Sequence, residues 1–355
     1  MSLLWVALLI FAVFALAYAT YGKFLSQVFE LDPNAPTPAV VKNDGNDFIP
    51  TAPPILLGQH FAAIAAVGPI VGPILAGLVH GWMPGLLWVA LGTIFIGGVH
   101  DFAALIASVR HDARSVAELV KIYVTPRAYL MFLAFIWISL VYVIIVFADL
   151  TATAFVAPPY GGGVATSSLL YLVLAVAMGL ALAKSRLPLW FITLIFVPIL
   201  LGLIVIGQWY PIALPPLPFL GLSEQSTWFI AIMVYCLVAS IIPLWILLQP
   251  RGYLGATFLY GSFAVGLIGM LIGGVTIQYH AHIHQLLFGL PQGGAFPLFP
   301  LLFTTIACGA CSGFHGIVSS GTTSKQLRKE TDARLIGYGG MMLEGVVARI
   351  AMATL

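Results

Sequence analysis

This sequence of 355 residues contains few charged residues. Asp, Glu, Lys and Arg make up 7% of the chain, whereas 61% of its residues are hydrophobic and its mean hydropathy is +1.06. Soluble domains carry about 25% charged residues, so the composition excludes a soluble fold and indicates a polytopic membrane protein. The formal net charge of +2 says little by itself. We expect membrane lipids around the chain and no nucleic-acid partner.

Cysteine is scarce, and the short motifs of common enzyme classes are missing. Cys236, Cys308 and Cys311 all fall in apolar segments, and an odd number of such thiols argues against a disulfide framework. Cys308 and Cys311 are three apart, but no second cysteine pair completes a zinc site. GxSxG, HExxH, Walker and Rossmann patterns do not occur, so neither a hydrolase nor an ATP-driven pump is supported. We expect no enzyme, no metal and no cofactor.

Apolar stretches long enough to cross a bilayer follow one another along the chain. The first, within residues 1–22, has no basic n-region and no small-residue cleavage site, so we interpret it as a retained leading helix. A loop at 30–54, rich in Pro, precedes the next span at 58–79. The sequence thus predicts an all-α polytopic membrane helix bundle of about ten spans. The remaining spans are Gly85–Val109, Ala128–Asp149, Val164–Ala183, Pro188–Gly207, Thr227–Leu248, Tyr253–Tyr279, Pro297–Val318 and Arg334–Leu355.

The placement of the basic residues supports this number of spans. When the chain is threaded alternately through the membrane, thirteen of the fourteen Lys and Arg residues fall on one side. Only Arg349 is left inside a span. Cytoplasmic loops carry an excess of Lys and Arg, and a wrong number of spans would scramble the pattern. The basic loops are therefore predicted to be cytoplasmic.

The most informative stretch is 307–325, ACGACSGFHGIVSSGTTSK, which is apolar enough for a bilayer yet carries a polar stripe. Glycines beside the stripe would let a neighbouring helix approach closely. The alternative is that the polar side chains only bond back to the preceding turn of their own helix. On a continuous helix, spacings of +4, +7, +11 and +14 place one set on a single face, namely Cys308, Ser312, His315, Ser319 and Thr322.

Hydroxyl residues cluster around Gly321 at the predicted cytoplasmic end of this stretch. A helix can unwind there and expose backbone carbonyls, as transporters often do at an ion or substrate site. We therefore expect an ion or a substrate to bind at this end of the stretch. The candidate binding residues are Ser312, His315, Ser319, Ser320, Thr322 and Thr323.

Two Gly-Pro pairs lie inside the span at 58–79. Each proline removes a backbone donor and strains the preceding turn. A helix interrupted at both pairs would free carbonyls for a cavity, a neighbour or an ion. The alternative is a proline-kinked packing helix. The candidate binding residues of this span are His60, Gly68, Pro69 and Gly72, and the second pair is Gly72-Pro73.

Asp101 is one of the few ionisable residues inside a predicted span. It shares a helical face with Gly97, Ala104 and Ser108, so its carboxylate is expected to point at a close neighbour and not at lipid. An intramembrane Asp is a functional-site hypothesis by default, because burial lets it trade a proton. A structural ion pair or hydrogen bond is the alternative.

Two further ionisable groups lie in the last span. Glu344 sits mid-way along it, and Arg349 is five residues on, so the two side chains occupy different faces. Each is expected to have its partner on another helix, and Glu344 is a further candidate binding residue.

Alternating histidines, His280, His282 and His284, fall in a short predicted outer loop. Such a pattern can bind metal, but no carboxylate or thiol accompanies it, so an interfacial loop is favoured.

Several long phrases of the sequence resemble one family. DPNAPTPAVVKNDGNDFIPT, GQHFAAIAAVGPIVGP, GGVHDF, ACGACSGFHGIVSSGTTSK and IGYGGMMLE resemble the carbon starvation protein A family of bacterial inner-membrane transporters, over nearly the whole chain. The resemblance implies a multi-pass inner-membrane protein that takes up peptides or small carboxylates such as pyruvate. His100 stands where Gln is usual and Ser324 where Pro is usual, and Ala66-Val67 replaces a Gly-Ala pair; the substrate therefore stays open.

That family is also similar to the amino acid–polyamine–organocation superfamily, whose fold is an inverted repeat of five plus five helices. On this pattern one transmembrane domain would hold a first repeat at 58–207 and a second at 227–355. A cation would lie between core helices one (58–79) and eight (297–318). The tenth core helix would follow Leu355, so a missing C-terminal half or a second chain would complete the bundle. We then expect Glu344 or Arg349 to be unpaired or exposed at the bundle edge.

Three functions stay open at this point. The first is a secondary transporter for a peptide or small organic acid, driven by H⁺ or Na⁺. The second is a membrane sensor or channel, which would bind or conduct without accumulating its ligand. The third is an intramembrane metalloenzyme that uses the histidines.

Overall fold

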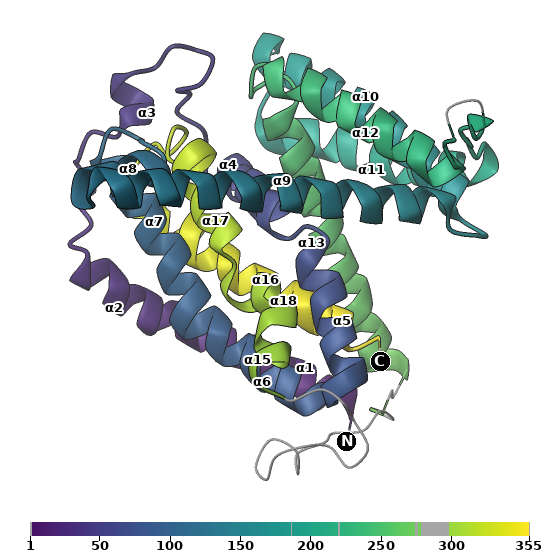
Figure 1. Cartoon of the computed structure of the whole chain (residues 1–355), viewed down its shortest axis with the longest axis horizontal. Coiled ribbons are helices and arrows are strands. Elements are labelled where there is room, and N and C mark those ends of the chain that lie inside the picture. Colours follow the sequence, from purple (N-terminus) through teal and green to yellow (C-terminus); the bar gives the residue numbers. More distant parts are fainter. Residues whose placement is uncertain (1, 186, 219–220, 274–275, 278–297, 355) are drawn as a thin grey trace. The chain divides into compact units, whose positions relative to one another are not determined.

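The computed structural model describes residues 2–185, 187–218, 221–273, 276–277 and 298–354 (Figure 1). Apart from isolated β-bridges, every regular element in these residues is a helix, which confirms the predicted all-α bundle. Eight of the described helices are long and apolar enough to cross a membrane, and the bent pair α4–α5 would make a ninth. The predicted histidine loop at 280–284 lies outside the described residues.

The chain forms two compact units, and one of them comprises residues 120–255. In it α10 packs along α11, and α12 packs against α9. The predicted span Thr227–Leu248 is too long at its end, because α12 stops at Ile241. Ile242 is extended before Pro243, and a residue that precedes proline disfavours the helical region. The helices of this unit are α9 (Pro126–Val156), α10 (Gly161–Lys184), α11 (Leu189–Trp209) and α12 (Glu224–Ile241).

The other unit comprises residues 1–119 and 256–355 and is built around α18 (Gly339–Met352). The helices α8 (Val116–Tyr123) and α13 (Leu248–Gly273) each run from one unit into the other. The helices before them in this unit are α1 (Leu3–Ala19), α2 (Tyr21–Val28), α3 (Pro38–Val41), α4 (Pro53–Ile64), α5 (Gly68–His80), α6 (Trp82–Gly92), η1 (Thr93–Gly97) and α7 (Gly98–Arg110). After them come α15 (Leu298–Thr305), α16 (Ala307–Cys311), α17 (Gly313–Val318), η3 (Ser319–Thr323), η4 (Glu330–Asp332) and η5 (Arg334–Tyr338).

The last helix is the most enclosed of the membrane-spanning helices that the structure describes. The span that contains α18 is 83% buried, because α5, α4, α6 and α1 pack around it. Glu344 is 0% exposed and Arg349 7%, so neither residue is exposed at the bundle edge. The other half of the prediction holds for Arg349, because its buried Nε and Nη2 atoms have no hydrogen-bond partner in the described residues. Part of this enclosure comes from the leading helix α1: its Phe14 ring lies against Gly345, and the Arg349 guanidinium stacks 5.1 Å from the ring centroid.

The span predicted at 58–79 is broken once and not twice. α4 ends at Ile64, α5 begins at Gly68, and the two helices differ in direction by 43°. The helix continues through Gly72-Pro73, so the prediction of a second break is wrong. Gly72 instead allows close packing, since a Cβ at this position would meet the Thr305 carbonyl. A bent, proline-containing helix therefore passes close to the backbone of the segment that begins with α15.

The span predicted at Pro297–Val318 is not one helix. In the described part, 298–318, the chain forms the short helices α15, α16 and α17, and Ser312 between the last two has an extended backbone (φ −75°, ψ 124°). None of these helices is long enough to span alone, so the expected ten spans fall to the eight or nine observed in the described residues. The polar stretch thus lies on interrupted backbone, which membranes tolerate only where protein or a cavity surrounds it.

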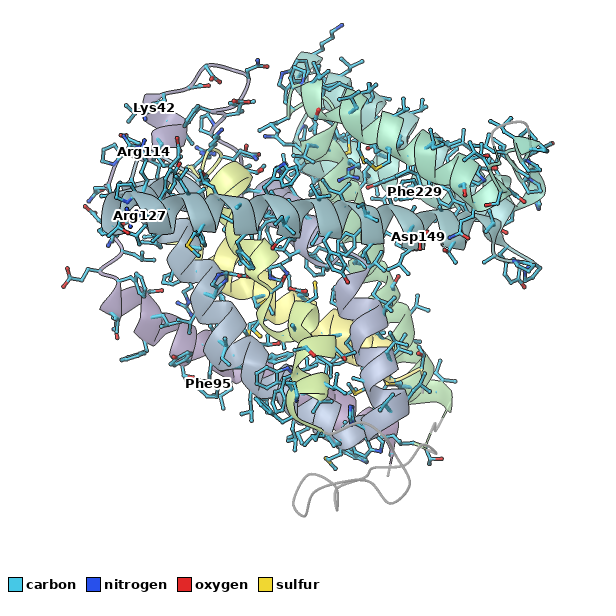
Figure 2. All side chains as sticks on the ribbon, in the orientation of Figure 1. Lys42, Phe95, Arg114, Arg127, Asp149 and Phe229 are labelled. Carbon is cyan, nitrogen blue, oxygen red and sulfur yellow. The ribbon has the colours of Figure 1, made fainter. Side chains whose placement is uncertain are left out.

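Loops that the charge pattern assigned to one side of the membrane meet in the structure. Lys42 and Arg114 lie at the same end of their unit (Figure 2), and the Lys42 ammonium is 3.1 Å from Asp112. At this end the Arg110 guanidinium is 2.6 Å from the buried Glu330 carboxylate. These contacts agree with the predicted common side for the loops near residues 42, 112 and 330.

The close packing of α6–α7 on α16 predicts the effect of one methyl group. In Gly97→Ala the new Cβ would meet the Ala310 carbonyl and come within 2.8 Å of Met341. We expect a loss of about 1–3 kcal/mol in the free energy of unfolding, since overpacked cores cost that much. Thermal unfolding of the purified protein in detergent measures it.

Gly261→Ala is the matched control, because Gly261 lies in α13 with open space around it. Alanine favours a helix by up to about 1 kcal/mol over glycine, so this variant should be as stable as the parent or more so. Equal stability of both variants would contradict the close approach at Gly97.

Candidate functional site

A buried ionic cluster joins three segments of the unit built around α18. The Nδ1 atom of His315 is 2.9 Å from Oδ2 of Asp101, and its Nε2 atom is 3.3 Å from Oε2 of Glu344. All three side chains are 0% exposed. Two carboxylates therefore face one imidazole inside an apolar bundle. Because unpaired buried charge is costly, this arrangement favours the binding of positive charge.

The face of α7 that was predicted to point at a close neighbour does so. Asp101 reaches His315, and the Ser108 hydroxyl donates to the Ser320 carbonyl at 3.1 Å. One turn before Asp101, Gly97 lies against the carbonyl of Ala310. The small and polar residues of this face thus place the carboxylate within α16, α17 and η3, away from lipid.

His100 extends the cluster to an exposed surface. Its Nδ1 atom is 3.0 Å from Oδ1 of Asp101, and its side chain is 44% exposed. The ring lies over Gly316, where a Cβ would come within 2.7 Å of Cε1, so a larger residue at 316 would displace the His100 ring. A continuous series of polar contacts therefore runs from an exposed imidazole through Asp101 and His315 to buried Glu344.

A π-helical turn adjoins each of the helices that carry the cluster. The turn η1 leads into α7 with Asp101, η3 follows α17 with His315, and η5 leads into α18 with Glu344. Such turns are rare, and they frequently occur at functional sites because each shifts the register of the following side chains by a residue. Here η1 and η5 precede the helices that carry Asp101 and Glu344, and η3 sets the register of the residues that follow His315.

The turn η3 also corrects the predicted stripe. The Ser324 amide donates to the Ser319 carbonyl five residues earlier, at 2.9 Å, so the helix is locally widened. As a result Thr323 is buried, and its hydroxyl is 2.9 Å from Nδ1 of His60, while Thr322 is only half-buried. The prediction that Thr322 continues the His315 face is therefore wrong, because it assumed a continuous α-helix.

The His60–Thr323 contact joins the two interrupted segments of the bundle. His60 lies on α4, just before the break, and Thr323 ends η3. Nε2 of His60 and Oγ of Ser319 are both buried and have no hydrogen-bond partner in the described residues. Unpaired buried polar atoms at a crossing of broken helices are what an ion or a polar ligand would satisfy.

The other predicted site residues lie around the cluster, and their role in binding stays a prediction. The Ser320 hydroxyl bonds back to the Gly316 carbonyl at 2.7 Å and accepts from the Val116 amide at 3.0 Å. Ser312 forms the backbone break between α16 and α17. Gly68 and Pro69 begin α5, and Gly72 provides its close packing. These residues shape the segments around the cluster and do not enter its ionic contacts.

Cys308 is a member of the site that the sequence did not single out as a ligand. One potential metal-binding atom each of Cys308, His315 and Glu344 lie within 4.8 Å of one another. The stripe at 307–325 placed Cys308 on the same face as His315, but Glu344 comes from a distant span. Only the packing of α18 brings the third group to the pair.

A family model described as carbon starvation protein CstA matches residues 2–355. The chain belongs to this family. It is 38% identical to the peptide transporter CstA of Escherichia coli K12 over 99% of this chain and 50% of the relative. It is 37% identical to the pyruvate/proton symporter BtsT of the same organism, over 99% of this chain and 48% of the relative.

The peptide transporter CstA of Bacillus subtilis is 35% identical over 97% of this chain and 57% of the relative. The chain spans about half the length of the curated relatives it matches. No solved structure matches the chain. The resemblance inferred from the motifs is thereby confirmed, while the inverted repeat of five plus five helices stays a prediction.

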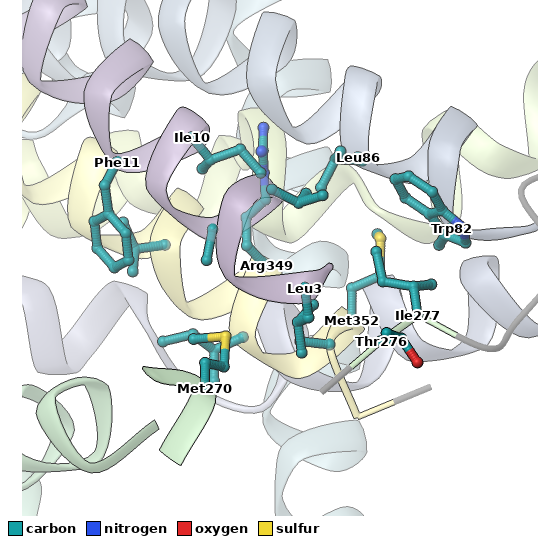
Figure 3. A pocket seen from close by; sticks show the side chains of 15 residues that line it. Leu3, Ile10, Phe11, Trp82, Leu86, Met270, Thr276, Ile277, Arg349 and Met352 are labelled. Atoms are coloured by element: carbon teal, nitrogen blue, oxygen red, sulfur yellow. The ribbon is translucent and has the colours of Figure 1, made fainter. Parts of the chain in front are cut away.

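A separate cavity of about 260 Å³ lies between α1, α6, α13 and α18 (Figure 3). Its walls are apolar side chains such as Ile10, Trp82 and Met352, and Arg349 is the charged residue among them. None of the predicted site residues lines it. In this CstA-family chain the ionic cluster around His315 and this cavity are therefore different places.

The shifted register in η3 predicts different effects for two adjacent threonines. Thr323→Val leaves Nδ1 of buried His60 without its partner, which should cost about 1–3 kcal/mol in the free energy of unfolding. Thr322→Val keeps its backbone contact to Gln326 and removes a half-buried hydroxyl, so its cost should be near zero. Thermal unfolding of both purified variants compares them, and a larger loss for Thr322→Val would restore the continuous helix.

Proposed function

We propose that this protein is a secondary active transporter that imports peptides or small carboxylates such as pyruvate across the bacterial inner membrane, and that it is not an enzyme. The observation that carries the proposal is the buried Asp101–His315–Glu344 cluster at the crossing of two interrupted helical segments. The names of the relatives support the substrates, and the CstA family supports the class of protein.

Interrupted helices suit a protein that alternates between two conformations. The break between α4 and α5 and the break at Ser312 lie in segments that pack together. Broken helices in transporters place backbone groups at the binding site and let half-helices rock around it. Of the described residues, His60 on α4 and Thr323 on η3 make the direct polar contact between these segments. A movement of α4–α5 would therefore displace η3, which follows the helix that carries His315.

The charge of the cluster suits coupling to a cation. Asp101 and Glu344 flank His315, so the site has more acidic than basic groups when its histidine is neutral. A bound H⁺ or Na⁺ would offset this charge, and its arrival would change the energy of the two conformations unequally. The exposed His100 next to Asp101 gives the cluster a contact to the outside of the bundle.

Transport and its coupling ion are tested together by uptake of labelled pyruvate and dipeptides into vesicles that contain the protein. An H⁺ gradient and an Na⁺ gradient are imposed separately. We expect accumulation above the outside concentration with one of the gradients. Equilibration without accumulation would indicate a channel, and binding without uptake a sensor.

Asp101→Asn should abolish gradient-driven accumulation, because it removes one of the two buried negative charges while keeping the shape of the side chain. The matched control is Asp149→Asn. Asp149 also lies in an apolar helix, but it is exposed and bonds to Gln225 at 2.9 Å. Accumulation at the parent level in Asp101→Asn, with both proteins inserted equally, would contradict the role of the cluster.

A further inference from the structure

Three side chains around His315 bring together atom types that commonly bind metal ions. Sγ of Cys308, Nε2 of His315 and a carboxylate oxygen of Glu344 all lie within 4.8 Å of one another. In a tetrahedral zinc site with bonds of about 2.0–2.3 Å, the ligand atoms are about 3.5 Å apart. Side-chain shifts of about 1 Å would therefore bring these atoms onto one ion.

The atoms that face this point lack stronger partners. His315 Nε2 and both Glu344 oxygens are buried and make no hydrogen bond within the described residues. The approach of 3.3 Å between His315 and Glu344 is longer than the 2.7–2.9 Å of a charge-assisted hydrogen bond. Unpaired buried polar atoms need a reason, and a shared ion would satisfy all of them at once.

Asp101 stands where metal sites place their supporting carboxylate. Its Oδ2 atom is 2.9 Å from Nδ1 of His315, on the ring side opposite Nε2. When Nδ1 carries the proton and donates to Asp101, Nε2 presents its lone pair to Cys308 and Glu344. Metal-binding histidines almost always donate their second ring nitrogen in this way, which fixes the ring and strengthens the ligand.

We propose that Cys308, His315 and Glu344 bind a divalent transition-metal ion of the zinc type, with Asp101 as the supporting carboxylate. Thiolate and imidazole ligands favour such an ion over Na⁺, Mg²⁺ or Ca²⁺, which prefer oxygen. Three protein ligands leave a fourth position open for an exchangeable group. The proposal that this ion binds does not depend on the protein being a transporter.

One consequence rests on the proposed function. The ion would occupy the acidic centre that we assign to the coupling cation, so its binding and gradient-driven uptake should exclude each other. Zinc-type ions would then inhibit this transporter from within its membrane-buried core.

Cobalt is the probe, because Co²⁺ bound to a thiolate shows a charge-transfer absorption band and Zn²⁺ does not. The full chain, purified in detergent and freed of metal with a chelator, is titrated with Co²⁺. We expect one thiolate band that saturates at one ion per chain and disappears when Zn²⁺ is added. Excess Mg²⁺ or Ca²⁺ should leave the band unchanged. Cobalt held only by histidines elsewhere gives no thiolate band.

Variants locate the ion. Cys308→Ser should remove the band, while Cys311→Ser, a thiol three residues on that is outside the ligand group, should keep it. Asp101→Asn should keep the band but weaken the apparent affinity by about 10- to 100-fold, as supporting residues do. Gel filtration of each variant as a single symmetric peak shows that folding is retained.

Two results would overturn the site: a folded parent protein without a thiolate band, or a band that survives Cys308→Ser. The uptake assay with added Zn²⁺ is a separate arm. If the band forms as expected but Zn²⁺ leaves gradient-driven uptake unchanged, metal binding stands and the coupling role of the cluster fails. If uptake is gradient-driven and no band forms, the transporter stands and the metal site fails.

Discussion

The structure of the unit around α18 depends on the cost of burying Asp101 and Glu344 together. Both carboxylates are 0% exposed, and a single imidazole, His315, stands between them. An isolated charge in the bilayer core costs a few kcal/mol or more, so neither carboxylate can stay there without a partner or a bound cation. The surrounding helices must therefore hold three side chains from α7, α17 and α18 at one point.

Small residues and widened turns make that meeting possible. Gly97 lets the backbone of α16 approach closely, where a Cβ would meet the Ala310 carbonyl, and Gly316 on α17 leaves room for the His100 ring of α7. The turns η1, η3 and η5 then rotate the side chains on each segment by part of a turn. Three such turns around one cluster indicate that its contacts offset the lower stability of the irregular helical turns. Backbone irregularity here serves the site.

Sequence reasoning found the members of the cluster but not its assembly. Asp101 could be placed correctly because one face of a regular helix follows from spacing alone, and its small neighbours marked that face. Thr323 could not be chosen over Thr322, since a single π turn moves the face and leaves no pattern in the residues. The place of Cys308 opposite Glu344 depends on long-range packing. The burial of α18 was missed for the same reason: spacing does not show that α1 folds back over Gly345 and Arg349.

The negative charge that supports our proposal of a coupling cation at this cluster would also attract a more tightly binding metal ion. An acidic centre that releases H⁺ or Na⁺ in each cycle must bind it only moderately, because a cation held too firmly would trap one conformation. A thiol at Cys308 adds affinity for soft metal ions without adding affinity for Na⁺.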